Sequence, residues 1–228
     1  MTISVLMPAE GGPFPVLLNR NPYNNNLDRY EVDALYLAQR GYAAVIQDVR
    51  GRWDSPGEWV PFLHEAQDGD DAIAWAARQS WSTGQVGLWG ASYHGLTQWQ
   101  AAQSGSPHLV AIAPRVAYSN TYHNWVYTGG AFQLGFNLWW SIAMSTHTTQ
   151  VQPLWFPEEA HLQTLFWHLT LHTIDQAAGR TIRHLRDWLA HPAYDEYWRS
   201  LRPVEEHYTD VAVPALGMAG WFDVFLQG

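Results

Sequence analysis

Apolar runs of strand length recur along the first half of the chain. After a candidate edge strand at Thr2–Met7 they cover Pro15–Asn19, Tyr42–Gln47, Val86–Trp89 and Leu109–Ala113. Continuous apolar runs of this length are typical of strands that are buried on both faces. They therefore predict the strands of a mostly parallel sheet.

Segments with helical periodicity lie between these runs. We expect helices over residues 28–40, over Ile73–Gln79 and from His94 onward. The first of them carries three apolar side chains on one face, at Val32, Leu35 and Tyr36. Strands that alternate with helices at short spacing indicate right-handed βαβ units, so the fold class is α/β.

The alternation stops after residue 117. No clear strand is visible over residues 118–208, and the aromatic-rich segments there have helical patterns, at Trp139–Ser145, His161–Thr173 and Thr181–His191. The strand pattern resumes at Val211–Gly217. We therefore expect a core formed by residues 1–117 and 209–228 and an inserted all-helical cap at 118–208. The sheet is expected to be incomplete at its C-terminal end.

Composition narrows the class of protein. The chain has 228 residues, 47% of them hydrophobic and 14% charged, which is typical of a globular domain. Its net charge of −9 argues against nucleic acid as a partner, since phosphate binding needs clustered positive charge. All 12 basic residues are arginine, so Schiff-base chemistry on lysine is excluded within this chain. There is no cysteine, and we expect no metal and no cofactor.

The expected compartment follows from what the sequence lacks. No basic segment followed by an apolar run opens the chain, so we see no signal peptide, and no apolar run has membrane-spanning length. We expect a cytoplasmic protein that does not interact with a membrane. The oligomeric state stays open.

One stretch points to chemistry, namely Val86–Ser104. It predicts a strand, a tight turn at Gly90-Ala91-Ser92-Tyr93, and a helix. A serine between small residues at such a turn has the geometry of a nucleophile elbow, which presents its hydroxyl at the carboxyl edge of the sheet. The N-terminus of the following helix points its N–H groups and its positive dipole end at the same place.

Five motifs occur in one order along the chain. They are Asn21-Pro22-Tyr23, Asp48-Val49-Arg50-Gly51 with Ser55-Pro56-Gly57, Gly90-Ala91-Ser92-Tyr93-His94-Gly95, His191-Pro192-Ala193-Tyr194-Asp195, and Gly220-Trp221-Phe222-Asp223. In this order they resemble the cocaine-esterase and X-Pro dipeptidyl-peptidase group of serine hydrolases. The resemblance covers almost the whole chain and implies an α/β-hydrolase fold.

The resemblance implies roles for individual residues. Ser92 would be the nucleophile, and the Tyr23 hydroxyl and the Tyr93 N–H would donate to the oxyanion. Asp223 would orient the catalytic histidine, and Trp221 would line the pocket or pack beneath it. Two donors aimed at the developing negative charge are what acyl transfer requires.

Two further motif positions are interpreted as structural. We expect Asp48 and Arg50 to form a buried ion pair that braces the loops around the site, in preference to contacting substrate. His94 lies two residues beyond Ser92 on the same turn. Because an imidazole there does not readily face the serine hydroxyl from the side opposite the oxyanion hole, we expect it to be structural or pocket-lining.

The expected base is missing. The triad order requires a histidine after Asp223, but the last histidine of the chain is His207. We consider, in order, a fragment of a longer reading frame, a natural truncated pseudoenzyme, and substitution by a histidine of the cap. Without its base the chain alone should be a poor catalyst, since triad members act as a unit.

These observations lead to a hypothesis of ester or amide hydrolysis through an acyl-enzyme on Ser92. A tryptophan-rich cap favours bulky or aromatic acyl groups, and the substrate would be a small molecule or short peptide. X-Pro dipeptidyl-peptidase activity would require an anionic site for the substrate ammonium, for which Glu158 and Glu159 are candidates by charge alone. Acyl transfer to an amine is a further alternative. The rival from another class is a hydrolase-fold binding protein that has lost its base.

Overall fold

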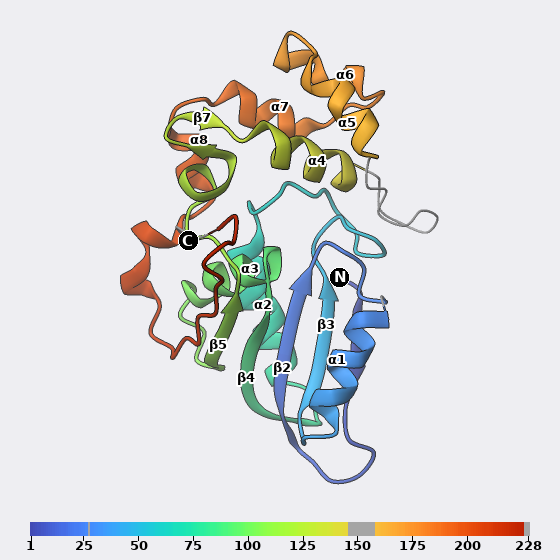
Figure 1. The fold of residues 1–228 in the computed structure, drawn as a ribbon. Helices are drawn as coiled ribbons and strands as arrows, with labels where there is room; N and C mark the ends of the chain where they lie inside the picture. The colour runs from blue at the N-terminus through green and yellow to red at the C-terminus, as the bar shows by residue number, and fades with distance from the viewer. Residues whose placement is uncertain (27, 146–157, 226–228) are drawn as a thin grey trace.

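The central sheet has four parallel strands and one antiparallel edge strand (Figure 1). The computed structural model describes residues 1–26, 28–145 and 158–225. The strands lie in the order β1-β3-β2-β4-β5, and β1 is antiparallel to β3. Their bounds are Ile3–Leu6 for β1, Phe14–Asn21 for β2, Ala43–Asp48 for β3, Ser82–Ala91 for β4 and Leu109–Arg115 for β5. The predicted α/β class is confirmed, and each of the five expected early strands is present.

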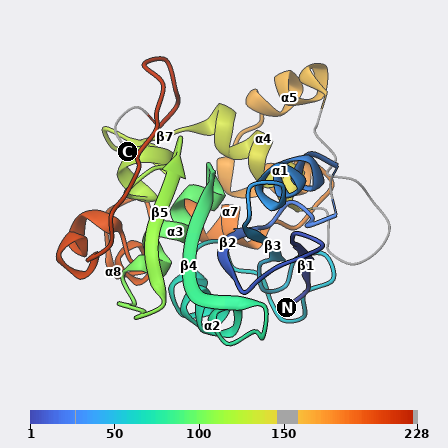
Figure 2. The ribbon, with the colours of Figure 1, turned by 90° about the horizontal axis from the view of Figure 1, so that it is seen from below.

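Helices cover both faces of this sheet (Figure 2). Helix α1 (Asp28–Ala38) packs on one face, and α2 (Glu65–Ala77) and α3 (Tyr93–Ala102) pack on the other. The alternation along β3 follows from this arrangement. Ala44 and Ile46 contact the α1 side, whereas Ala43 and Val45 belong to the cluster beneath α2 and α3.

The contact face of α1 differs from the expectation. Val32, Leu35 and Tyr36 are at least half exposed, while Tyr30 and Ala34 are buried against the sheet. The smaller alanine side brings the helix close to β3, so the bulkier apolar residues face outward.

Helix α2 is longer than the pattern indicated. It begins at Glu65, eight residues before the predicted start at Ile73. Its first turns are polar because ion pairs, and not apolar contacts, hold Glu65 to Arg20 of β2 and Asp68 to Arg50 in the loop after β3. Apolar periodicity therefore misses this part of the helix.

The cap region lies over the carboxyl ends of the parallel strands (Figure 1). It is helical apart from a short hairpin, β6 (Tyr127–Thr128) and β7 (Ala131–Phe132), which is an exception to the expected all-helical cap. Its main helices are α4 (Leu134–Met144), α5 (Glu159–Phe166), α6 (Ile174–Ala177), α7 (Arg183–Ala190) and α8 (Glu196–Ser200). Shorter helical turns are η1 (Tyr122–Val126), η2 (Leu171–Thr173), η3 (Val204–Glu206) and η4 (Tyr208–Asp210). None of the helices in the described part of the chain combines the length and apolar character that a membrane span requires.

The segment after the cap returns to the sheet without forming a regular strand. Val211–Gly217 was expected to be a strand, but the segment makes only isolated parallel bridges to β5, at Ala215 and Met218. Backbone hydrogen bonds join it to Ile112 and Pro114 of β5. Pro214 has no N–H to donate, which weakens a continuous ladder.

The fit of α3 under the elbow generates a stability prediction. A Cβ on Gly95 would lie 2.5 Å from the Cβ of Ala117, so Gly95→Ala should destabilise the protein by about 1–3 kcal/mol. The matched control is Gly135→Ala in α4, where an added Cβ would meet open space. Because alanine favours the helix more than glycine does, this substitution should stabilise the protein by up to about 1 kcal/mol. Chemical denaturation of both variants measures the difference. Equal effects would contradict the proposed close approach.

Candidate active site

Ser92 occupies the sharp turn between β4 and α3. Its backbone has φ 61° and ψ −125°, a conformation that non-glycine residues rarely adopt. The Ser92 N–H donates to the carbonyl oxygens of Arg115 and Val116, at 2.9 and 3.1 Å, which ties the strained residue to the end of β5. The serine is half-buried. These features are those of a nucleophile elbow.

Gly90 is required by the close approach of three elements. Its φ is 135°, and a Cβ there would lie 2.5 Å from the Cβ of His94 and 2.6 Å from the amide nitrogen of Asn19. A larger residue would push α3 away from β2. The glycine therefore sets how tightly the turn that carries Ser92 can close.

Tyr93 is the first residue of α3, and its side chain is a buried anchor. Its hydroxyl donates to Glu65 Oε1 at 2.7 Å and accepts from Trp59 Nε1 at 3.2 Å. Burial, followed by the neighbouring Glu65 carboxylate, raises the pKa of Tyr93 well above its ordinary value. The N–H of a first helical residue has no intrahelical partner, so the backbone of Tyr93 can serve as a donor at the helix end.

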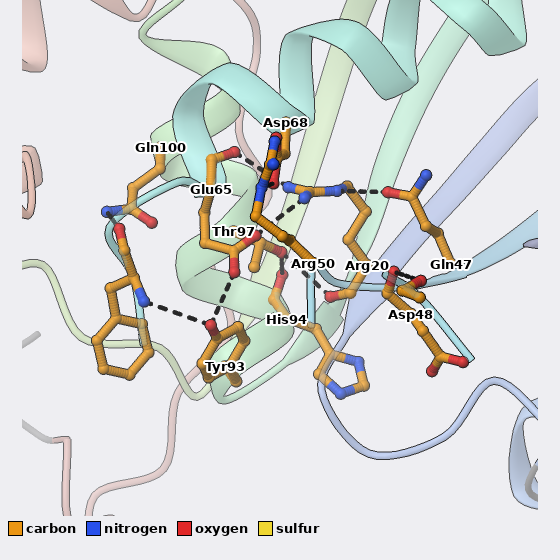
Figure 3. A network of polar contacts seen from close by, with 12 residues as sticks. Arg20, Gln47, Asp48, Arg50, Glu65, Asp68, Tyr93, His94, Thr97 and Gln100 are labelled. Carbon is orange, nitrogen blue, oxygen red and sulfur yellow. Dashed lines mark hydrogen bonds and ion pairs between the residues drawn. The ribbon is translucent and has the colours of Figure 1, made fainter. Parts of the chain in front are cut away.

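A buried ion pair lies beneath this anchor (Figure 3). Arg20 Nη2 is 3.0 Å from Glu65 Oε2, and the two side chains are only 2% and 5% exposed. Arg20 also donates to Gln47 Oε1 at 2.8 Å and to the Glu65 carbonyl at 3.0 Å. Burial raises the pKa of Glu65, while the charge of Arg20 acts in the opposite direction. The pair joins β2, β3 and α2 to Tyr93, the residue that follows Ser92.

Tyr23 lies just beyond the end of β2, and its ring reaches the residues that follow Ser92. Its ring packs edge-on against Tyr93, with centroids 6.4 Å apart, and lies 5.4 Å from the ring of His94. Trp140 Nε1 donates to the Tyr23 hydroxyl at 3.4 Å. A hydroxyl oxygen that accepts a hydrogen bond is itself a better donor. The sequence motifs give no signal for this contact between the cap and Tyr23.

Arg52 fixes the loop that carries Tyr23. It is 2% exposed, and its Nε donates to the Pro22 carbonyl at 3.0 Å. Trp53 Nε1 donates to the same oxygen at 2.9 Å, and Arg52 Nη1 donates to the Met144 carbonyl of α4 at 2.9 Å. Arg52 thus connects the loop of Tyr23 to the cap. In the sequence, this role of Arg52 is indicated only by its position directly after the Asp48-Val49-Arg50-Gly51 motif.

The expected ion pair between Asp48 and Arg50 is wrong. Arg50 instead makes a two-point contact with Asp68 of α2, in which Nε donates to Oδ2 at 2.9 Å. Asp48 Oδ1 accepts the N–H of Asn25 at 2.8 Å, in the loop beyond Tyr23. Both residues therefore connect loops to the core. Asp48, the last residue of β3, holds the loop beyond Tyr23, whereas Arg50 holds the loop after β3 to helix α2.

Asp48 is also electrostatically unusual. Its side chain is fully buried, and burial, together with the charge of Asp54, raises its pKa to about 7. The hydrogen bond from Asn25 acts in the opposite direction. A carboxyl group close to the Tyr23 loop therefore titrates near neutral pH.

His94 faces the core and not the serine hydroxyl. Its Nδ1 lies 3.0 Å from the Asn19 amide nitrogen, and its Nε2 lies 3.1 Å from the Tyr30 hydroxyl. Both ring nitrogens thus have partners on β2 and α1. These contacts agree with a structural role.

The remaining expected site residues lie near the end of the described chain. Asp223 is half-buried, and its Oδ1 accepts the N–H of Phe225 at 2.8 Å. Trp221 is 85% exposed, so its place in a pocket stays a prediction. Glu158 and Glu159 are exposed at the start of α5. Within the described ranges no three His, Asp or Glu side chains gather as a possible metal site.

The raised pKa of Asp48 predicts pH-dependent stability. The folded protein holds the proton up to about pH 7, whereas an unfolded aspartate releases it near pH 3.8. The protonated Asp48 therefore contributes its full stability below about pH 3.8, and this contribution is lost as the pH rises through about 7. Asp48→Asn should therefore gain stability over the wild type as pH rises from 4 to 8, on the order of 4 kcal/mol.

Urea denaturation of the full-length protein across this pH range measures the effect of Asp48→Asn. The exposed Asp33→Asn on α1 is the matched control for loss of a carboxylate. A constant difference between Asp48→Asn and wild type at all pH values would contradict the assignment.

Known proteins are similar to this chain in sequence and in fold. The sequence pattern of the X-Pro dipeptidyl-peptidase (S15) family matches residues 1–228. A cocaine esterase from Rhodococcus sp. (strain MB1 Bresler) is 36% identical over 99% of this chain. The chain spans only 42% of the length of that relative.

Solved structures agree on the fold. An aminopeptidase from a marine sediment Thaumarchaeota archaeon superposes with a TM-score of 0.80 and 22% identity, over 97% of this chain and 40% of its own. An alpha-amino acid ester hydrolase does so with a TM-score of 0.76 and 22% identity, over 98% of this chain and 42% of its own. The fold is that of the α/β-hydrolases, and the chain belongs to the X-Pro dipeptidyl-peptidase (S15) family of hydrolases.

Proposed function

We propose that this chain carries the nucleophile and the oxyanion hole of a serine hydrolase that cleaves acyl ester or amide bonds. The observation that carries the proposal is the backbone of Ser92, held at φ 61° on a strand-to-helix turn at the N-terminus of α3. A strained conformation of this kind persists where the surrounding structure enforces it, and such sites are commonly catalytic. The activity of the complete protein is part of the proposal, because the chain spans less than half the length of the cocaine esterase that it matches.

Two donors converge on the turn. The Tyr93 N–H belongs to the first residue of α3, and the ring of Tyr23 packs against Tyr93 and His94, the two residues after the serine. Glu65 and Arg20 hold Tyr93, and Arg52 and Trp53 hold the loop of Tyr23. Donors fixed before the reaction need no reorganisation as negative charge develops, which is the main source of their catalytic effect.

The proposed reaction has two steps. Ser92 Oγ attacks the carbonyl carbon as a base removes its proton, and the carbonyl electron pair moves to the oxygen that Tyr23 and the Tyr93 N–H stabilise. Collapse of this intermediate expels the alcohol or amine with the proton from the base and leaves an acyl-serine. Water, activated by the same base, then releases the acid and restores the serine.

Asp223 is proposed to orient the base, as the chain order nucleophile, acid, histidine requires. The base itself is proposed to be a histidine that follows Asp223 outside these 228 residues. His94 is a poor substitute because both of its ring nitrogens already have partners.

The acyl group is proposed to be bulky and apolar. A cluster of buried aromatic side chains lies next to Tyr23, formed by Trp125, Trp140 and Trp188 of the cap together with Phe62 and Phe225 of the core. Trp140 contacts both Trp125 and the Tyr23 hydroxyl. Recognition of a peptide ammonium finds less support, since Glu158 and Glu159 are exposed and Arg52 places a positive charge near Tyr23.

The nucleophile is tested by covalent labelling of the full-length protein with a fluorophosphonate. We expect a single adduct on Ser92 and none in Ser92→Ala, because the reagent reacts with activated serines. Ser104→Ala, just beyond α3, should label as wild type. Labelling that survives in Ser92→Ala would refute the assignment, and a protein that folds but never labels would favour the binding-protein alternative.

The oxyanion donor is tested by Tyr23→Phe. Loss of one such donor should lower kcat by roughly 10²–10³-fold with little change in KM, because the hydrogen bond strengthens only in the transition state. Tyr127→Phe is the control, since its hydroxyl bonds to the Trp188 carbonyl within the cap. A rise in KM at unchanged kcat would instead make Tyr23 a substrate-binding residue.

A further inference from the structure

The loop that carries Tyr23, residues 22–26, leads from the end of β2 towards α1. Its first part is held through the carbonyl oxygen of Pro22, which accepts two hydrogen bonds from the loop after β3. Its second part is joined to β3 by the Asn25 N–H, which donates to Asp48 Oδ1 at 2.8 Å. The Asp48 carboxyl group therefore holds the half of this loop that follows the proposed oxyanion donor.

The backbone of Asp48 is fixed from two sides. The residue ends β3, a strand in which every residue is buried. Its N–H donates to the Thr2 carbonyl at 3.1 Å, and its own carbonyl accepts the Ser55 hydroxyl at 2.8 Å. Ser55 Oγ in turn accepts the Thr2 N–H at 2.8 Å. If the contact between Asp48 and Asn25 opens, the loop moves and Asp48 stays in place.

Three polar atoms of these two contact residues are buried without a hydrogen-bond partner. They are Asp48 Oδ2 and both polar atoms of the Asn25 side chain, Oδ1 and Nδ2. Asp48 is 0% exposed and Asn25 is 3% exposed. Oδ2 is thus closed to solvent, and a proton is the ligand that it can take without any space being opened. An ionised Asp48 is instead a buried charge with one oxygen unsatisfied, which strongly disfavours the closed loop.

The loop after β3 brings two opposite charges to Asp48. Burial, together with the charge of Asp54, raises the pKa of Asp48 to about 7, whereas the charge of Arg52 acts in the opposite direction. The backbone N–H groups of Asn25 and Asn24 also favour the ionised form. Burial outweighs these contributions, so the closed loop favours the protonated carboxyl group.

The other elements around Asp48 bring few ionisable groups. Residues Thr2–Leu6 on the β1 side contain no ionisable side chain. On β2, the charge of Arg20 is paired with Glu65. Helix α1 packs against β3 with Tyr30, whose hydroxyl lies 3.1 Å from His94 Nε2. Among these described groups, none forms an ion pair with Asp48, so protonation is the way in which its buried charge is neutralised.

We propose that Asp48 is a positioning residue whose bound proton keeps the Tyr23 loop closed, so that loss of the proton releases this loop and the oxyanion donor that it carries. The effect on the oxyanion donor rests on the proposed function, whereas the opening of the loop does not. The closed loop has its full stability below about pH 3.8, the ordinary value for an exposed aspartate, and loses this contribution as the pH rises through about 7.

Hydrogen exchange of the full-length protein, followed by mass spectrometry on the peptide that covers residues 22–26, tests the opening of the loop. The open state binds one proton fewer than the closed state, so its population should grow about tenfold per pH unit. After correction for intrinsic exchange rates, protection should fall about a hundredfold from roughly pH 5 to pH 7. Val45 of the buried β3 should stay more strongly protected throughout. Protection of the loop equal to that of Val45 would mean that the loop opens only with the whole protein, and would overturn the proposal.

Asp48→Asn carries a neutral amide of nearly the same shape, whose oxygen can accept the Asn25 N–H. It should hold the loop closed, with protection that does not change over the same pH range. Asp33→Asn, at an exposed position on α1, is the matched control and should show the pH dependence of the wild type. A wild-type loop whose protection is independent of pH would refute the proposal, as would an equal pH dependence in Asp48→Asn.

The link to the oxyanion donor is tested with hydrolysis of 4-nitrophenyl butyrate. The ratio of kcat in Asp48→Asn to kcat in the wild type should rise at least about threefold from roughly pH 5 to pH 7, with similar KM values, because Tyr23 acts in the transition state. A ratio that is constant with pH would separate Asp48 from Tyr23 and overturn that part of the proposal. If neither protein hydrolyses the ester, the proposed function fails, and the exchange data still decide whether Asp48 controls the loop.

Discussion

The buried ion pair between Arg20 and Glu65 is the constraint on which the site depends. Removing two charges from water costs several kcal/mol for each ion, and the structure offsets this cost with hydrogen bonds from Tyr93 and to Gln47. Because these partners belong to β2, β3, α2 and α3, satisfying the pair fixes the relative positions of all four elements. Ser92 keeps its unfavourable backbone because the elements on both sides of it are held in this way.

The loop after β3 connects the elements around this ion pair to the cap. Arg50 anchors the loop to Asp68 of α2, while Arg52 reaches the Pro22 carbonyl and the Met144 carbonyl. Trp59 of that loop donates to the Tyr93 hydroxyl and packs against Trp140 of α4. One loop therefore connects Tyr93, the loop of Tyr23 and the aromatic side chain of Trp140 in the cap.

The sequence predicted the sheet and the elbow because both depend on local patterns. Strands buried on both faces are continuous apolar runs, and the elbow needs small residues at Gly90 and Gly95 for reasons of steric fit. Partners distant in sequence were not predictable. Arg50 pairs with Asp68 and not with Asp48, and Arg52 donates to the carbonyl of Met144, 92 residues away. The outward face of α1 was missed because the alanines on its other side carry little hydrophobic signal.

Phe225 gives the acidic residue of the proposed triad an unexpected support. Its side chain is 5% exposed and packs among Tyr118, Trp125 and Phe136, while its N–H donates to Asp223. The loop of Asp223 is thus anchored in the aromatic interior of the cap. In the proposed hydrolase, the carboxylate that would orient the base therefore shares its mechanical support with the aromatic side chains proposed to contact the acyl group.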